Sequence, residues 1–231
     1  TASPYYPFVG PRNPIIISAN GIPIFTGVVS DWDLDYGFTT SSNVTSVQCV
    51  DDFTVFANQA LGLFTPAEES SGERVEDVLT RPEVVYQGGT AISAGASTLG
   101  AFEVSQGTNV MQYLQAVTAS EQGFMFMSAG GVFTFTSRAD ALNPAPVIDF
   151  SDDGTGIRYQ ALTNAYGDEL LYNLIQTGSP AGAVQTASDP DSIALYQSQV
   201  LSKTDLLNST VAEVDALGEY LLGRYKDPQV R

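Results

Sequence analysis

Carboxylates are the side chains with the widest chemical scope in this sequence, because it holds 26 Asp+Glu, no histidine and one cysteine. Without an imidazole, histidine-dependent nucleophile pairs and His-ligated metal sites are excluded. A bound metal would have to use oxygen ligands. Cys49 alone cannot close an intramolecular disulfide, and its setting beside Val47 and Val50 predicts a small buried residue.

Asp31, Asp33 and Asp35 alternate along the chain as the first ligands of a calcium loop do. The match is poor, since Tyr36 stands where such a loop needs glycine and Ser42 where it needs a bidentate glutamate. Aromatic and aliphatic residues alternate with the three carboxylates. This pattern predicts a half-buried strand with its acids in water.

Other candidate sites are equally weak. Asp152-Asp153-Gly154 resembles an aspartic-protease loop only in composition and predicts a turn. Ser97 lacks both a nucleophile-elbow glycine and a base. Asn43 and Asn208 begin glycosylation triplets, which matter only in a eukaryotic secretory pathway. A carboxylate pair for glycoside cleavage stays open because the fold sets its geometry. We therefore predict no catalytic, cofactor-binding or metal site.

The charge balance limits the possible partners. A net charge of −17, spread over both halves of the chain, argues against binding nucleic acid or anionic lipid through basic contacts. Hydrophobic residues make up 43%, enough for a core, so the chain is not a disordered acidic tail. We find no signal peptide and no apolar run that could span a bilayer, and expect a soluble protein. Since the chain begins with Thr1, an initiator Met or a longer precursor has been left out.

The first half of the chain predicts short strands followed by short helices. A proline-rich extended arm covers 1–14, and an apolar hairpin turns at Asn20-Gly21. The further predicted elements are strands at 31–38 and 44–50, a helix from Asp51 or Asp52 to Leu61, a helix from a capping box at Ser70 and Glu73 to Pro82, weak strand and loop over 84–107, a helix at 108–123 and a hairpin over 124–137.

The second half predicts strands at 147–150, 157–162 and 170–176, a polar loop at 178–190, and two closing helices. The helices cover 191–203 and 210–225, the latter with a capping box completed by Glu213. Strands and helices are segregated along the chain, so the fold class is α+β with two small subdomains.

The order of these segments resembles the N-terminal hub region of tailed-bacteriophage minor tail proteins over about residues 20 to 231. The residues that carry the resemblance are Phe25 to Val29, Ser71 to Val75, the 124–138 hairpin, the Tyr172-Asn173 pair, Asp189 to Tyr196, and Leu221 to Pro228. The family usually has glycine after the helix tyrosine, where this sequence has Gln197. Further barrel strands commonly follow the last helix in such proteins, whereas this chain stops at Arg231.

The resemblance implies β-barrel-like hub subdomains with short amphipathic helices packed on them, at 15–83 plus 140–231, and an inserted helix-plus-hairpin subdomain at 84–139. It implies a non-enzymatic virion protein at the tail tip. Copies would form a ring, commonly a homotrimer, that links the tail tube to the host-attachment apparatus around the DNA exit path. Its partners would be tube, distal tail, fibre or adaptor proteins. The barrel would be completed by another chain or by a continuation past Arg231.

Two alternatives remain open at this point. One is a carbohydrate-binding virion or cell-surface module that uses exposed aromatics such as Tyr5, Tyr6 and Trp32. The other is a glycan hydrolase with a carboxylate pair.

Overall fold

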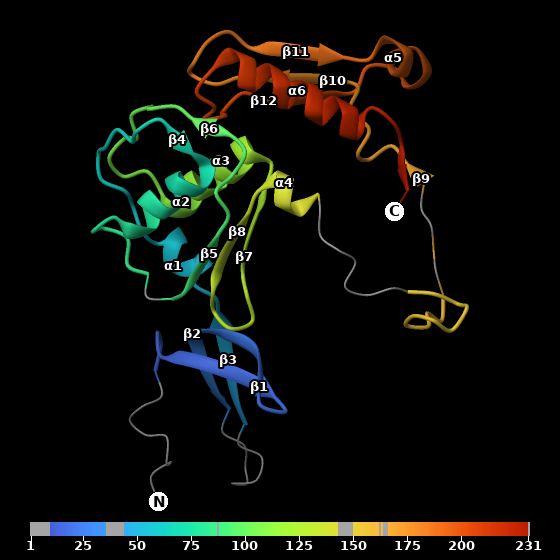
Figure 1. Cartoon of the computed structure of the whole chain (residues 1–231). Helices are drawn as coiled ribbons and strands as arrows, with labels where there is room; N and C mark the ends of the chain where they lie inside the picture. Colours follow the sequence, from blue (N-terminus) through green and yellow to red (C-terminus); the bar gives the residue numbers. More distant parts are fainter. Residues whose placement is uncertain are drawn as a thin grey trace, which may run out of the picture.

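The structure is a computed structural model that describes residues 10–35, 44–86, 88–142, 150–161, 163 and 166–230. Small sheets and short helices follow one another along the chain (Figure 1). The α+β class is confirmed. The elements are β1 (Pro14–Ala19), β2 (Ile22–Asp35), β3 (Val44–Val50), α1 (Phe53–Ala57), β4 (Glu69–Ser70), α2 (Ser71–Thr80), β5 (Thr90–Ile92), β6 (Thr98–Leu99), α3 (Val110–Glu121), β7 (Phe124–Met127), β8 (Phe133–Thr136), α4 (Arg138–Ala141), β9 (Tyr166–Gly167), β10 (Leu174–Thr177), β11 (Gln185–Ser188), α5 (Pro190–Tyr196), β12 (Val200–Lys203), α6 (Val211–Tyr225) and β13 (Gln229–Val230).

The first sheet has the order β1-β2-β3 and is antiparallel throughout. Asn20 and Gly21 turn the predicted hairpin with positive φ angles of 51° and 79°, as the Asn-Gly pair favours. The strand predicted for 31–38 is present as the end of β2 up to Asp35, and 36–38 lie outside the described residues. Of the predicted arm, 1–9 also lie outside them, and Pro14 already belongs to β1.

The central part holds α1 to α3 and the sheet β5-β8-β7 around one hydrophobic core. The capping box of α2 is present: Ser70 Oγ accepts from Glu73 N, and the Glu73 carboxylate accepts from Ser70 N. The helix predicted to reach Leu61 is shorter, because α1 ends at Ala57. The fully buried members of this core include Phe56, Val78, Leu99, Val110, Leu114, Val117 and Phe133.

The C-terminal part contains the sheet β11-β10-β12, on which α6 packs (Figure 1). Leu217 and Leu221 of α6 meet Ile175 of β10 in a second core. Strand β10 pairs antiparallel with β11 and parallel with β12.

Three predictions for this part were wrong. The 191–203 helix ends at Tyr196 and is followed by β12, because Gln197 leaves the helical conformation and 200–203 pair with β10. The loop predicted for 178–190 contains β11. Of the strand predicted for 157–162, Ile157 makes only an isolated bridge with Phe150, and 158–161 form no strand. The strand predicted for 170–176 is present in its second half, as β10. Residues 147–149 of another predicted strand lie outside the described residues.

The central and C-terminal parts are joined by backbone and side-chain bonds. Gly100 N donates to Leu207 O at 2.8 Å, and Ser120 Oγ accepts from Leu207 N at 2.7 Å. The predicted capping box of α6 is only half present. Thr210 accepts from Glu213 N, but the Glu213 carboxylate accepts from Thr98 N and Ser209 Oγ instead of closing the box. The helix cap thus serves the junction between the two parts.

The described strands form five open sheets of two or three strands, so a β-barrel stays a prediction. The boundaries at residues 84 and 139 also stay a prediction. The central core draws its residues from both sides of the first boundary, Val75 and Val78 packing with Leu114 and Phe133. Within the described residues, no helix has the length and apolar character that crossing a membrane requires.

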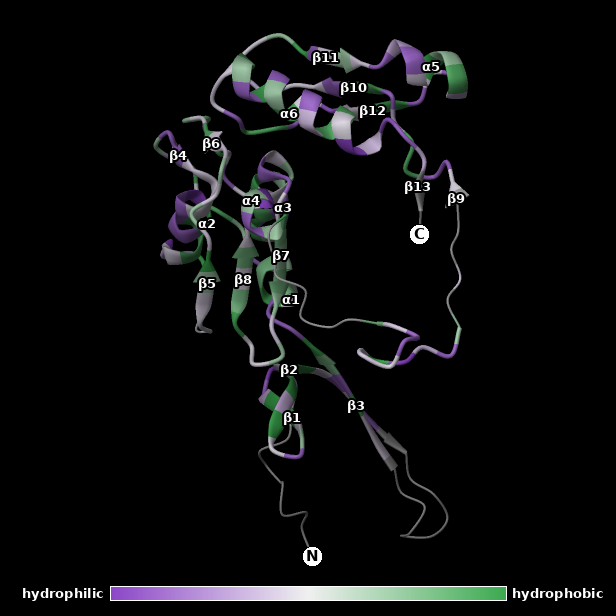
Figure 2. Cartoon of the chain, turned by 45° about the vertical axis from the view of Figure 1, so that its right-hand side comes forward, coloured by the Kyte–Doolittle hydropathy of each residue, from purple (hydrophilic) through white to green (hydrophobic). Residues whose placement is uncertain are grey.

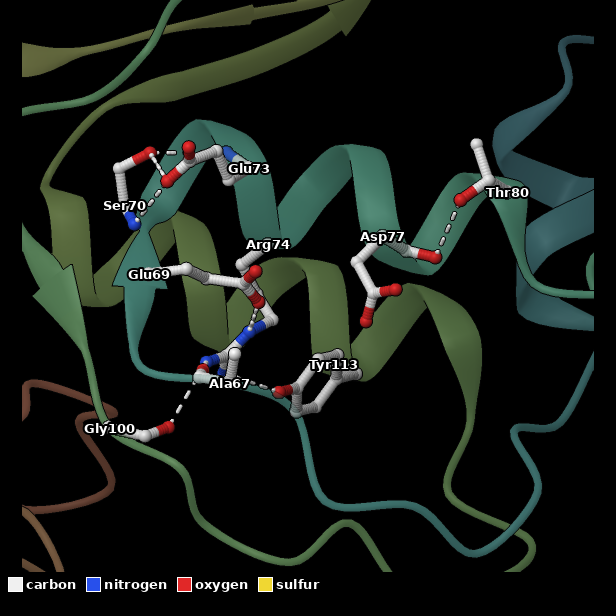
Figure 3. Close-up of polar contacts among 9 residues, drawn as sticks. All are labelled: Ala67, Glu69, Ser70, Glu73, Arg74, Asp77, Thr80, Gly100 and Tyr113. Atoms are coloured by element: carbon white, nitrogen blue, oxygen red, sulfur yellow. Dashed lines mark hydrogen bonds and ion pairs between the residues drawn. The ribbon is translucent and has the colours of Figure 1, made fainter.

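A buried arginine stands inside the central part (Figure 3). Arg74 of α2 is fully buried and pairs with Glu69. Its other nitrogens donate to Tyr113 Oη at 2.9 Å, Ala67 O at 2.7 Å and Gly100 O at 3.1 Å. These bonds satisfy the guanidinium and tie α2 to α3 and to two loops. Burial raises the pKa of Tyr113, so its hydroxyl stays protonated beside the cation.

Replacing Arg74 tests how much this network contributes to the stability of the fold. Arg74→Leu leaves the Glu69 carboxylate and two carbonyls without their partner, and should lower the free energy of unfolding by about 3 to 5 kcal/mol. Arg81→Gln is the control, since its pair with Glu83 lies nearer to solvent and should contribute clearly less to the free energy of unfolding. Equal losses in urea denaturation would contradict a special role for Arg74.

Candidate functional site

The hairpin of β1 and β2 exposes three isoleucines. Ile16 pairs with Thr26, but the register shifts between Ile17 and Ser18, so Ile22 pairs with Ala19 and Ile24 lies at the irregularity. The irregularity breaks the alternation, and the apolar side chains at this end of the sheet occupy both of its faces. Ile16 is 65% exposed, Ile22 68% and Ile24 58%. We call these three exposed side chains of the hairpin, Ile16, Ile22 and Ile24, together the isoleucine face. Three large aliphatic side chains exposed at one end of a sheet favour contact with another apolar surface.

No helix lies over this sheet among the described residues (Figures 1 and 2). The other apolar side chains of the sheet are only partly shielded, with Val29 buried but Ile17 42% and Val47 37% exposed. A three-stranded sheet with apolar side chains gains stability when they pack against another surface. The exposed isoleucines are open to such a contact.

The sheet is fixed to the central part near its base. Thr26 Oγ1 donates to Ala129 O, in the turn between β7 and β8, at 2.9 Å. Gly131 of the same turn allows the close approach, because a Cβ at this position would lie 2.7 Å from Thr26 Cγ2. These contacts set the direction in which the isoleucine face points.

Trp32 and the acids of β2 lie as the alternation predicts. Asp31 and Asp33 are exposed, whereas Trp32 is half-buried. The Trp32 indole N–H is buried and has no hydrogen-bond partner among the described residues. It is not the open aromatic platform that a carbohydrate module would use, and Tyr5 and Tyr6 lie outside the described residues. Asp35 belongs to β2, but the structure describes only its backbone.

The segments that carry the family resemblance in the C-terminal part meet at one buried side chain. Asn173 is fully buried, and its amide donates to Ser192 Oγ at 3.2 Å and Gln197 O at 2.8 Å. Its Oδ1 accepts from Gln199 N at 2.8 Å. One side chain thus joins the residues before β10 to α5 and to the start of β12.

The end of α6 closes the same node. Ser192 Oγ donates to Lys226 O at 2.6 Å, and the Lys226 ammonium donates to Asp189 at 2.8 Å. Asp189 also caps α5 by accepting from Ser192 N. The hydrogen bond from Lys226, followed by that from Ser192, lowers the pKa of Asp189. The Tyr172 and Tyr225 rings meet edge to face with centroids 6.1 Å apart.

Gln197 occupies the position where the family that the sequence resembles usually has glycine, and its backbone conformation is one that glycine favours. Its φ of 63° and ψ of 172° lie in a region that side chains other than glycine rarely adopt. The bend is therefore kept despite the glutamine. The Asn173 amide bonds to the Gln197 carbonyl and holds the chain there.

The remaining candidates from the sequence form no reactive cluster. Ser97 is buried and donates to Ser120 O, and Cys49 is half-buried. Asp152 to Gly154 form the predicted turn, with Gly154 at a φ of 89°. Asn208 is 1% exposed, which removes it as a glycosylation acceptor in the folded chain, and Asn43 lies outside the described residues. In the described ranges, no three acidic or cysteine side chains group as metal ligands would.

Two features of this geometry were not foreseen. The apolar hairpin was predicted, but not that its isoleucine face would stay uncovered. The run Ile15-Ile16-Ile17 was a usable signal, because consecutive isoleucines make both faces of a strand apolar. The buried Arg74 network had no signal, since Tyr113 and Gly100 reach it from distant segments.

Solved structures of phage tail proteins share this fold. One is the 43 kDa tail protein of prophage MuSo2 from Shewanella oneidensis, with a TM-score of 0.58 and 14% identity, over 96% of this chain and 67% of that one. Another is the tail protein from Neisseria meningitidis MC58, with a TM-score of 0.62 and 11% identity, over 92% and 64%. The resemblance to tail proteins found in the sequence is thus confirmed as a likeness of fold.

This chain spans about two thirds of the length of these two tail proteins. Comparison of the sequence with protein-family models gives no match. Comparison with curated proteins gives none either.

Replacing Gln197 by glycine tests the strained bend. Gln197→Gly should raise the free energy of unfolding by about 1 kcal/mol, because relief of the backbone strain outweighs the extra freedom of glycine in the unfolded chain. Gln199→Gly is the control: its φ is not positive, and it should lose about 0.5 to 1 kcal/mol. If denaturant titration finds Gln197→Gly less stable than the parent chain, the bend is not strained.

Proposed function

We propose that this chain is a structural protein of a bacteriophage tail that works by assembly and not by catalysis. The observation that carries the proposal is a fold shared with two solved tail proteins over more than nine tenths of the chain, joined to a sheet with an uncovered isoleucine face. Copies of the chain form a ring at the tail tip, in which the isoleucine face of each copy packs on its neighbour. The number of copies expected from the resemblance is three.

The charge of the chain supports this role. A ring that surrounds the DNA exit path must let the phosphate backbone pass without trapping it, and a chain of net charge −17 repels phosphate. The acids Asp31 and Asp33 lie exposed near the apolar face and oppose unspecific aggregation of the sheet. In the virion, the ring joins the tail tube to distal tail, fibre or adaptor proteins that attach to the host.

Charge insertion on the isoleucine face tests this assembly. Ile22→Lys with Ile24→Lys should weaken self-association at least about 100-fold. Burial of each exposed isoleucine in the contact would contribute about 1.5 to 3 kcal/mol to the free energy of association. Leu195→Lys is the matched control, because Leu195 is a 75% exposed aliphatic residue on α5, away from the sheet. Sedimentation velocity over a concentration series measures the mass.

Wild-type chain and Leu195→Lys should both sediment as multiples of the 24.5 kDa chain, and the double variant as one copy. The proposal fails if the wild-type chain stays a monomer at every concentration. It also fails if the double variant assembles as the parent does.

A further inference from the structure

A cleft between the central and C-terminal parts gathers positive charge. It has a volume of about 330 Å³ and lies between the end of α3, the start of β7, the end of β12 and α6. Lys203 and Arg224 line it, and Arg138 lines a smaller adjoining cleft of about 120 Å³ that shares Phe124 and Tyr220 with it. Three of the nine basic residues of an acidic chain therefore meet in one place. We call the two together the basic cleft.

Carboxylates are not among the described residues that line the basic cleft. Glu121 lies behind it, fully buried, and accepts from Ser71 Oγ and from the Ala96, Ser97 and Arg138 amides. Glu219 lies only at an outer opening beside Leu142. The cleft therefore carries net positive charge.

Polar and aromatic groups hold the cations in the cleft. The Lys203 ammonium lies 3.5 Å from Gln122 Oε1, and burial lowers the pKa of this lysine. The Arg138 guanidinium lies 5.5 Å from the centre of the Tyr220 ring. Phe124 is 56% exposed at the same site. The lining suits a ligand that combines carboxylates with apolar side chains.

One segment of the chain itself combines carboxylates with exposed apolar side chains. Residues 150–159 form a loop that lies away from the sheets and helices in both views (Figures 1 and 2). Its apolar side chains are open to solvent, with Phe150 67% and Ile157 53% exposed. Asp152 and Asp153 lie between them, and Arg158 follows Ile157, so the segment carries a net negative charge. We call this segment the acidic loop.

The acidic loop is ordered by its own contacts. Asp153 Oδ1 accepts from Ser151 Oγ, Thr155 N and Thr155 Oγ1, and these bonds lower the pKa of Asp153 to about 2. The carboxylate is therefore ionised at neutral pH, and Oδ2 is left to meet a partner. A preformed loop also loses little conformational entropy when it binds.

We propose that the acidic loop of one copy docks in the basic cleft of the neighbouring copy. This inference rests on the proposed self-assembly and adds a second contact to it. Asp152 and Asp153 meet Lys203 and Arg138, while Phe150 and Ile157 cover Phe124 and Tyr220. Loop and cleft are different surfaces of the chain, so the contact is head to tail and can close a ring.

Cross-linking between two different variants tests the contact. One chain carries Lys203→Cys, the other Asp152→Cys, and both carry Cys49→Ala so that only the new thiols can react. Mixing and mild oxidation should give a two-chain disulfide product at about tenfold or more the yield of the matched pair with Asp191→Cys, whose acid lies exposed on α5. A second pair, with Arg138→Cys in place of Lys203→Cys, tests the same contact if the Lys203→Cys chain does not fold.

Each outcome decides between arrangements. Cross-linking of the mixed chains above the control supports docking between copies. Yields no higher than those of the Asp191→Cys control overturn docking between copies. A disulfide formed within one diluted chain that carries both Asp152→Cys and Lys203→Cys also overturns it, because the loop then binds the cleft of its own chain. If sedimentation still shows an assembly in these last cases, the proposed tail ring stands and only the loop contact fails.

Discussion

A sheet of two or three strands holds together in water only when an apolar face is packed against something, and this chain is built from such sheets. The sheet β5-β8-β7 packs on α1 to α3, and β11-β10-β12 packs on α6. The sheet β1-β2-β3 has no such helix among the described residues and exposes Ile16, Ile22 and Ile24. The uncovered isoleucines are the structural feature on which the proposed assembly depends.

The other two parts act as the support for that surface. The Arg74 network fixes α2 and α3, and the Asn173 node fixes α5, β12 and the end of α6. Bonds from Ser120 and Glu213 then hold the central and C-terminal parts together. Because these nodes are polar, buried and satisfied, they fix orientation as well as stability. The walls of the basic cleft come from both sides of this junction, so the cleft depends on it.

Local signals could be predicted from the sequence, and pairings between distant segments could not. The Asn20-Gly21 hairpin, the Ser70 capping box and the 124–137 hairpin each depend on neighbouring residues, and all three are present. The local pattern predicts a helix that continues to 203, because the pairing of 200–203 with β10 crosses more than twenty residues and leaves no local signal. The Asn173 pair was noticed as part of a resemblance, but its bonds to Gln197 and Gln199 appear only in the fold.

The most direct test of the central claim is a cryo-electron-microscopy reconstruction of the purified phage tail that contains this chain. We predict a ring of copies at the tail tip, with Ile16, Ile22 and Ile24 of each copy packed against a neighbouring copy. A tail without density for the chain would contradict the account, as would a tail in which the isoleucine face of β1 and β2 remains in contact with water.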